Sequence, residues 1–325
     1  MVEEILPNTY RIEIPLPKNP LKALNSYLIK GQERFLIIDT GMNRQECMDE
    51  MSSCLGRLSV DLKKTDFFIT HLHVDHIGLV GNLATHTSKV YFNDLEASIV
   101  SPDRAEGHLR QISAIYKSHG FAGDELKKAT TSHPAYLYGL KQHVDFCPLK
   151  EGDTIDIGDY SLRCIETPGH SPNHMCLYEA NKKVLISGDH ILSDITPNIA
   201  LWPEMENPLK EYLASLEKVY ALDVDLVLPG HRSVFNDHRK RIRELQEHHQ
   251  ARLKEVLSAL KDGEKTAFQI APWVSWDIDC SSWELFPPSQ KWFALGETIA
   301  HLIYLEENRM IQRKTKEQKI VFSLA

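Results

Sequence analysis

One short stretch constrains this chain more than any other feature: "THLHVDH", residues 70–76, gathers three histidines and an aspartate directly after the apolar run "DFFI". That run has the aromatic and β-branched character of a strand. Side chains two residues apart in an extended segment point the same way, so His71 and His73 can reach one metal ion. Asp75 and His76 follow where the chain turns and can face a second ion. The stretch is therefore a candidate metal site at a strand end.

Three later sequences also end an apolar strand with a side chain that can bind metal. "ETPGHS" places His170 on a Pro-Gly turn, "ISGDH" places Asp189 after an apolar run, and "VLPGH" places His231 on a second Pro-Gly turn. Glycine lets the backbone turn sharply there and present the imidazole. With 16 histidines in the chain, one cluster alone is as compatible with chance as with metal binding. Five histidines and two aspartates at strand ends predict metal binding.

The apolar pattern predicts an α/β domain over residues 1–237. Short β-branched runs alternate there with helical spacing, as in sheets covered by helices. Residues 101–145 break this rhythm with the helix-like "RAEGHLRQISAIYKSHG" and a mixed polar and aromatic stretch, which predicts a helical insertion or lid beside the site. From residue 238 the pattern is helical, with a stop at Gly263, and it ends in the strand-like "RKTKEQKIVFSLA". This predicts a small helical, winged-helix-like domain over residues 238–325.

Nine strands are expected in the α/β domain, several of them flanked by the Gly, Asn or Asp that turns prefer. They are "TYRIEI", "NSYLI", "RFLIID", "DFFIT", "KVYF", "SLRCIET", "HMCLYE", "KVLISG" and "DLVLPG". The stretch "DTIDIGDYSL" predicts a hairpin that turns at Gly158 and Asp159.

Composition favours a small molecule over nucleic acid or a membrane as the partner. The net charge of −8 gives no overall attraction to nucleic acid or to an anionic membrane. No apolar run is long enough to cross a bilayer, and the first residues lack the pattern of a secretory signal. The 6 cysteines are scattered without a CxxC pair, so neither a disulfide framework nor a sulfur-ligated zinc site is indicated. We expect a reduced, cytoplasmic protein.

Taken in order, HxHxDH, TPGH, GD and PGH resemble the motifs of the metallo-β-lactamase superfamily over residues 9–237. The resemblance implies an αββα sandwich of two packed sheets with helices outside, and two divalent metal ions at one edge. By motif position, it assigns His71, His73 and His170 to one metal, Asp75, His76 and His231 to the other, and Asp189 to a bridge between them. Zinc is the default metal, with iron and manganese as alternatives.

Finer features of the motifs are similar to particular branches of this superfamily. An aspartate at position 189 is similar to the glyoxalase II and tRNA-processing nuclease branches. The tail, with "HHQARLKEVLSAL" and "QKWFALGETIAHLIYL", resembles the winged-helix-like domain of the lactamase-like protein 2 group.

The expected activity is hydrolysis of a thioester or a related small ester-like substrate by a binuclear metal-dependent enzyme. Two metals can hold a bridging hydroxide as the nucleophile, so no side-chain nucleophile is needed. Asp75 is the expected catalytic residue, because it can bind metal and accept a proton from the attacking water. No residue is assigned to substrate binding.

Three alternatives remain open from the sequence. A metal-dependent RNA or phosphodiester nuclease would use the same metals, with the basic tail "RMIQRKTKEQK" against the phosphate backbone, although glutamates interrupt that tail. An iron-dependent, non-hydrolytic member of the fold would need only one metal. A binding protein could have kept the metal without turnover, with the tail as a dimer or partner interface.

Overall fold

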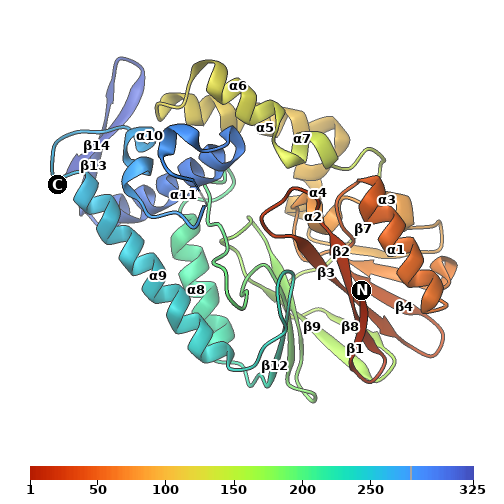
Figure 1. The fold of residues 1–325 in the computed structure, drawn as a ribbon. Helices are drawn as coiled ribbons and strands as arrows, with labels where there is room; N and C mark the ends of the chain where they lie inside the picture. The colour runs from red at the N-terminus through yellow and green to blue at the C-terminus, as the bar shows by residue number, and fades with distance from the viewer. Residues whose placement is uncertain (279) are drawn as a thin grey trace.

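The computed structural model describes residues 1–278 and 280–325, and it contains two β-sheets packed face to face with helices on their outer sides (Figure 1). Side chains alternate between the faces of a strand. Accordingly, Ile38 and Phe68 of the first sheet pack against Leu177 of the second, while Ile37 and Phe67 face the opposite way into a separate core. The expected α/β sandwich is confirmed.

The first sheet has the strand order β1-β2-β3-β4-β5-β6-β7. It consists of β1 (Val2–Leu6), β2 (Thr9–Pro15), β3 (Ala23–Lys30), β4 (Phe35–Ile38), β5 (Thr65–Phe68), β6 (Val90–Phe92) and β7 (Phe146–Pro148). The pairs from β1 to β4 are antiparallel, and those from β4 to β7 are parallel.

The second sheet has the order β12-β11-β10-β9-β8. Its strands are β8 (Thr154–Ile157), β9 (Tyr160–Glu166), β10 (Met175–Glu179), β11 (Val184–Gly188) and β12 (Leu226–Pro229). The predicted hairpin is the β8–β9 pair, and it turns at Gly158, whose φ of 57° is a conformation that glycine adopts readily. All nine expected strands are present, whereas β1 and the three-residue β7 were not among them.

Helices cover the outer faces of both sheets. Those of the first 237 residues are α1 (Gln45–Arg57), α2 (Val74–Ile77), α3 (Val80–Leu83), α4 (Asp94–Val100), α5 (Pro102–Ser118), α6 (Gly123–Thr131), α7 (Pro134–Tyr138) and α8 (Pro208–Tyr220), with a 3-10 turn at Leu62–Lys64. Helix α1 packs its Cys47 and Met51 on the first sheet, and α8 packs its Leu216 on the second. The segment expected as a helical insertion contains α5, α6 and α7.

The chain after residue 237 forms helices and a terminal hairpin. Its elements are α9 (His238–Ala259), α10 (Ala267–Ile270), 3-10 turns at Ala271–Trp273 and Trp283–Leu285, α11 (Pro288–Glu307), β13 (Ile311–Lys316) and β14 (Lys319–Leu324). Apolar side chains of α9 and α11 join one continuous core with the outer face of the second sheet, α8 and the insertion. The division at residues 237 and 238 stays a prediction. Within the described residues, no helix is both long and apolar enough to span a bilayer.

Candidate metal centre

Four strands end beside one another and deliver the predicted side chains to one edge of the sandwich. His71 follows β5, His170 follows β9, Asp189 directly follows β11, and His231 follows β12. Three groups, each with its ligand atoms within 4.8 Å of one another, contain all seven predicted residues. They are His71, His73 and His170; His71, His76 and Asp189; and Asp75, His76 and His231. The structure therefore brings together every side chain that the motifs single out.

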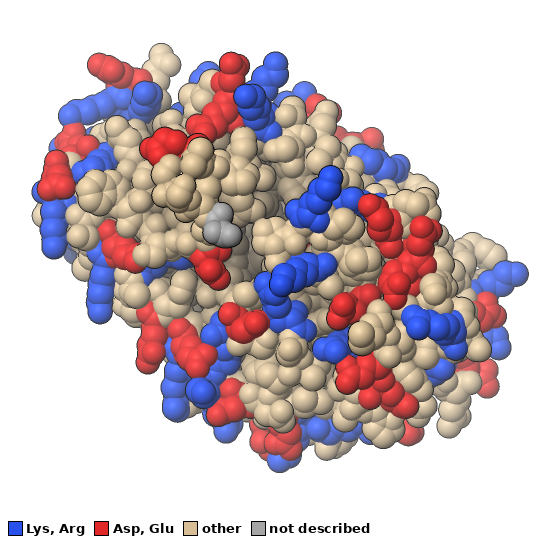
Figure 2. Space-filling model, in the orientation of Figure 1, with Lys and Arg blue, Asp and Glu red and all other residues tan. Residues whose placement is uncertain are grey.

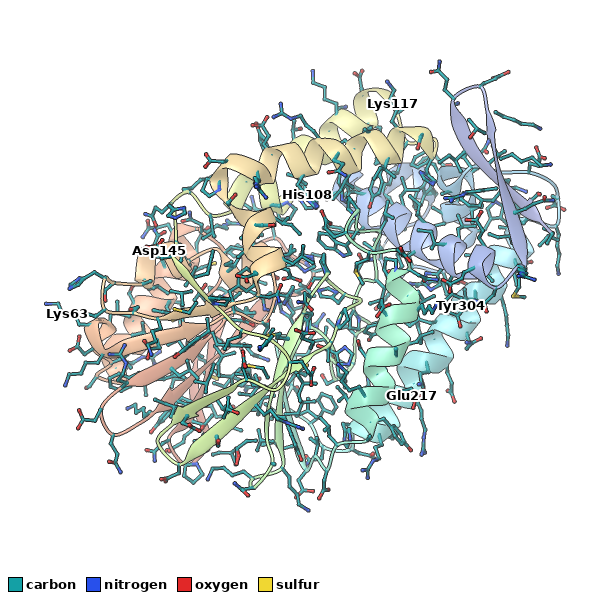
Figure 3. The ribbon with its side chains drawn as sticks, turned by 180° about the vertical axis from the view of Figure 1, so that it is seen from behind. Lys63, His108, Lys117, Asp145, Glu217 and Tyr304 are labelled. Carbon is teal, nitrogen blue, oxygen red and sulfur yellow. The ribbon has the colours of Figure 1, made fainter. Side chains whose placement is uncertain are left out.

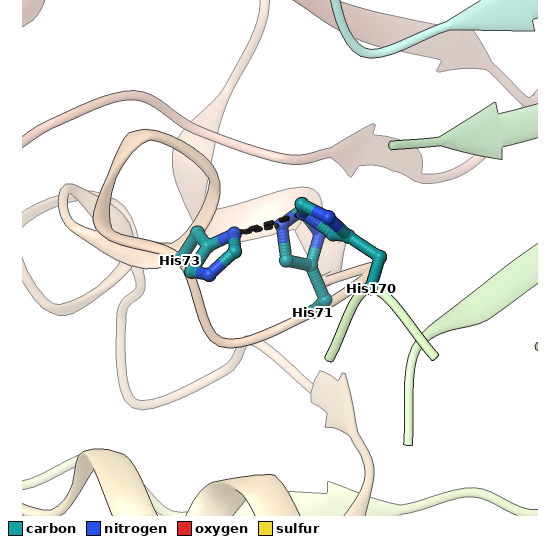
Figure 4. A group of neighbouring side chains, drawn as sticks. All are labelled: His71, His73 and His170. Carbon is teal, nitrogen blue, oxygen red and sulfur yellow. Dashed lines mark hydrogen bonds between the residues drawn. The ribbon is translucent and has the colours of Figure 1, made fainter. Parts of the chain in front are cut away.

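The first group is made of three histidines whose rings converge (Figure 4). His73 Nδ1 lies 2.9 Å from His71 Nε2 and 3.0 Å from His170 Nε2. Burial lowers the pKa of all three imidazoles, that of His73 to about 3. Neutral imidazoles keep a lone pair for a metal, and three nitrogens around one point are a usual zinc donor set.

The second group mixes carboxylates with imidazoles. His231 Nε2 lies 3.4 Å from Asp75 Oδ2. Burial alone would lower the pKa of His231, but the negative charges of Asp189 and Asp75 raise it to about 10. Burial likewise opposes the charged form of His76, while Asp39 and Asp189 raise its pKa well above the usual value. The carboxylates thus favour a cation at this point, and metal binding here competes with protons.

Asp189 lies between the two groups. Its Oδ1 is 3.5 Å from His76 Nε2, and its Oδ2 is 3.7 Å from His170 Nε2 and 3.5 Å from His231 Nε2. One carboxylate therefore contacts ligands of both groups, which is the position expected of a bridging residue.

Hydrogen bonds behind the site orient three of the imidazoles. His170 Nδ1 donates to the Asn198 carbonyl (2.8 Å), His231 Nδ1 to the Ala23 carbonyl (2.7 Å), and His76 Nδ1 to Asp39 Oδ2 (2.7 Å). Because each Nδ1 carries a proton, each Nε2 is turned toward Asp189 as the potential metal ligand.

The inward-facing atoms lack protein partners. The Nε2 atoms of His76 and His231 and the Oδ1 of Asp189 are buried without a hydrogen-bond partner among the residues that the structure describes. Buried polar atoms are normally paired, so this convergence calls for an ion or water. The donor set of imidazole nitrogens and carboxylate oxygens fits divalent metals of the zinc, iron and manganese kind.

Several residues beside the site were not assigned to it by the motif analysis. Asp39 contacts His76, and it ends the strand "RFLIID", so the rule that found Asp189 could have found it.

Trp202 Nε1 donates to the His170 carbonyl at 3.1 Å, and its ring centroid lies 5.8 Å from that of His73. His174 Nε2 accepts a hydrogen bond from the Asp189 backbone at 3.1 Å. These residues surround the predicted ligands.

The helical insertion reaches the segment beside the site. His108, labelled on α5 in Figure 3, places its Nε2 3.0 Å from Glu204 Oε1 and its ring 6.0 Å from that of Trp202. Helix α5 thus packs against the loop that follows β11, close to the three-histidine group.

A family model described as "Metallo-beta-lactamase superfamily" matches residues 21–231, and one described as "Metallo-beta-lactamase-like, C-terminal domain" matches residues 253–323. The first covers more than half of the 325 residues, and the chain belongs to the metallo-β-lactamase superfamily. The resemblance drawn from the motifs is confirmed.

Similar proteins span most of the chain. It is 25% identical over 296 residues to "Probable metallo-hydrolase YqjP" of Bacillus subtilis (strain 168), with 88% of each chain covered. It is 26% identical over 266 residues to "Atrochrysone carboxyl ACP thioesterase" of Aspergillus fumigatus, covering 80% of this chain and 67% of that one. The crystal structure of a metallo-beta-lactamase family protein from Thermus thermophilus matches with a TM-score of 0.82 and 29% identity, covering 99% of this chain and 100% of that one.

Proposed function

We propose that this protein is a hydrolase with two divalent metal ions that cleaves a thioester or a related small ester-like bond. The observation that carries the proposal is the carboxylate of Asp189, which contacts His170 of one ligand group and both His76 and His231 of the other. His71, His73 and His170 would hold one metal, and Asp75, His76 and His231 the other. Metals in such a site polarise the substrate carbonyl and make bound water acidic near neutral pH.

Asp75 is the side chain proposed to act on the attacking water. Burial would raise its pKa, but His231, whose Nε2 lies 3.4 Å from Asp75 Oδ2, and the positive charge of His76 outweigh burial and lower it to about 2. The side chain is therefore a carboxylate at neutral pH, able to accept a hydrogen bond that orients the water. A carboxylate of such low pKa is a weak base, so the hydrogen bond that orients the attacking water is its main proposed role.

The substrate class is supported by similar proteins and by the surface charge. Two relatives, from Aspergillus fumigatus and Paecilomyces divaricatus, carry the name atrochrysone carboxyl ACP thioesterase, each 26% identical. Acidic and basic side chains are interspersed over the face in Figure 2. In the terminal hairpin, Lys314 and Lys316 pair with Glu264, and Arg313 pairs with Glu306. This pairing weakens the attraction that a nuclease would need for a phosphate backbone.

The test compares two substrate classes on one preparation. Protein loaded separately with Zn²⁺, Mn²⁺ or Fe²⁺ is offered a panel of short and long acyl thioesters and a structured RNA. The variants are Asp75→Ala and, as a matched control, Asp145→Ala, whose side chain is fully exposed and is labelled in Figure 3. We expect thioester turnover in the wild type and the control, and a loss of about 10²-fold or more in Asp75→Ala. Cleavage of RNA alone would overturn the thioester assignment.

A further inference from the structure

The segment 198–202 holds His170 from two sides. The Asn198 carbonyl accepts a hydrogen bond from His170 Nδ1 at 2.8 Å, and Trp202 Nε1 donates to the His170 carbonyl at 3.1 Å. The first contact fixes the imidazole tautomer and turns Nε2 toward the other ligands. Any element that holds this segment in place therefore also holds a ligand of the proposed metal centre.

Helix α11, near the end of the chain, holds that segment. Asn198 Nδ2 donates to Glu297 Oε2 at 2.6 Å, and the Leu201 backbone N–H donates to the Gly296 carbonyl at 3.1 Å. A Cβ added at Gly296 would lie 3.0 Å from Ala200 Cβ and would collide with the Tyr116 hydroxyl. Glycine thus lets the backbone of α11 approach the segment closely.

Glu297 is itself fixed by a charge from a second helix. It is 3% exposed and forms an ion pair with Arg252 of α9, which is 7% exposed and also donates to the Ser275 carbonyl at 2.8 Å. A buried ion pair contributes little net stability compared with well-packed apolar side chains, so stability alone does not account for it.

Both carboxylate oxygens of Glu297 are engaged, Oε1 by Arg252 and Oε2 by Asn198. Glu297 also lies near His248 and His249, but with both oxygens engaged it is better suited to position Asn198 than to bind a metal there.

We propose that Glu297 is a positioning residue for the metal centre, acting through Asn198 on His170. This inference rests on the proposed function, because it requires His170 to bind metal. The chain of contacts runs from Arg252 on α9 to Glu297 on α11, then to the Asn198 side chain, and from the Asn198 carbonyl to His170. The helices after residue 237 would thereby set the geometry of a site built by the sheets.

Two double variants isolate the contact between Glu297 and Asn198. Arg252→Met with Glu297→Gln removes the ion pair but keeps an oxygen that can accept from Asn198 Nδ2. Arg252→Met with Glu297→Leu removes the ion pair and the acceptor, with a side chain of similar size. Neither leaves an unpaired buried charge, which would be strongly destabilising. Comparing the two therefore separates positioning from the ion pair.

The readouts are Zn²⁺ affinity by chelator competition and the visible absorption of the Co²⁺-loaded protein, both under conditions where circular dichroism shows full folding. We expect the Leu variant to bind Zn²⁺ about tenfold more weakly than the Gln variant and to change the Co²⁺ spectrum, because loss of an outer hydrogen bond loosens the ligand. Equal affinities and spectra in the two variants would overturn the proposal.

A control on the same helix tests for general damage to α11. Lys291 is 3% exposed and pairs with Glu125 of α6, so Lys291→Met removes another buried charge contact without touching the segment 198–202. Its Zn²⁺ affinity should match the wild type even if it is less stable, and a loss like that of the Leu variant would contradict a specific role for Glu297. Failure of the wild type to bind any of Zn²⁺, Co²⁺, Mn²⁺ and Fe²⁺ would instead refute the proposed function.

Discussion

The carboxylate of Asp39 ties Thr70, which begins the stretch 70–76, to His76, one of the proposed metal ligands. It accepts hydrogen bonds from the Thr70 backbone (2.9 Å), the Thr70 hydroxyl (2.8 Å) and His76 Nδ1 (2.7 Å), and it is only 2% exposed. All three hydrogen bonds need a carboxylate oxygen of Asp39 as the acceptor. The negative charge also favours a proton on His76 Nδ1, which leaves Nε2 to face Asp189.

Replacing Asp39 by asparagine should therefore weaken metal binding with little change in shape. One side-chain atom becomes an N–H₂ donor, so either Thr70 or His76 loses its acceptor. We expect metal affinity to fall about 10- to 100-fold, measured with a competing chelator. Asp66→Asn is the control, because that aspartate pairs with Arg34 instead of contacting the ligands. An unchanged affinity in Asp39→Asn would show that the complete set of hydrogen bonds to Asp39 is not needed for metal binding.

Whether a residue of the site can be recognised from the sequence depends on whether it acts through its side chain or through its backbone. Side chains that bind metal must be His, Asp, Glu or Cys, and in this fold they follow strands, so seven residues could be singled out from the letters alone. Asp39 obeys the same rule. Asn198 could not be found this way, because its carbonyl contacts His170 and every residue type has a carbonyl.

Helix α4 anchors the turn that carries His170. Its Glu96 is fully buried, and Oε1 accepts from the Ser171 hydroxyl at 2.6 Å and the Asn173 backbone at 2.7 Å. Burial raises its pKa from 4.5 to about 7, although the two hydrogen bonds act in the opposite direction. The other oxygen has no partner among the described residues, which is consistent with a carboxyl group that holds its proton.

This helix contact makes stability depend on pH in a defined direction. The folded-state pKa lies above the unfolded one, so the contribution of Glu96 to stability is greatest below pH 4.5 and is lost as pH rises toward about 7. Glu96→Gln keeps an acceptor for Ser171 and avoids the buried charge. Relative to wild type, the variant should gain up to about 3 kcal/mol between pH 5 and pH 8.

Urea unfolding of the metal-free proteins at the two pH values measures this gain. The exposed glutamate of β2 provides the control variant Glu13→Gln, which should show no such gain. A difference between Glu96→Gln and wild type that stays constant with pH would contradict burial of an ionisable Glu96.

Helices and strands with a strong apolar periodicity could be predicted from the sequence. Short elements that form only because a neighbouring strand or turn holds them could not. The helix expected from residue 238 is α9, which begins at His238. Its predicted stop at Gly263 lies four residues after the last helical residue, Ala259, because a turn intervenes in which the Gly263 N–H donates to the Leu260 carbonyl. The missed β7 has three residues at a sheet edge, too short for alternation to be visible.

At the scale of the whole molecule, the two parts separated by sequence pattern share one core. Tyr212 of α8 and Ile199 beside the site belong to the same buried cluster as Leu295 and Ile299 of α11. Separating α11 from the sheets would expose these side chains, each worth about 2 kcal/mol when buried. The pattern change at residue 238 indicates a change of element type, and the periodicity of each part alone cannot reveal that their apolar faces meet.

The shared core predicts that the chain unfolds as one unit. Four of its 5 tryptophans lie between residues 273 and 292, so tryptophan fluorescence mainly follows the C-terminal part, while release of Zn²⁺ to a chromophoric chelator follows the metal centre. In urea, the two signals should change at the same midpoint. Ile299→Ala, which opens a cavity at a side chain 1% exposed, should lower both midpoints together, by an equivalent of about 2–5 kcal/mol. Zn²⁺ retained after the fluorescence change is complete would mean that the helices unfold independently, and Glu297 could not then be required to hold His170 in place.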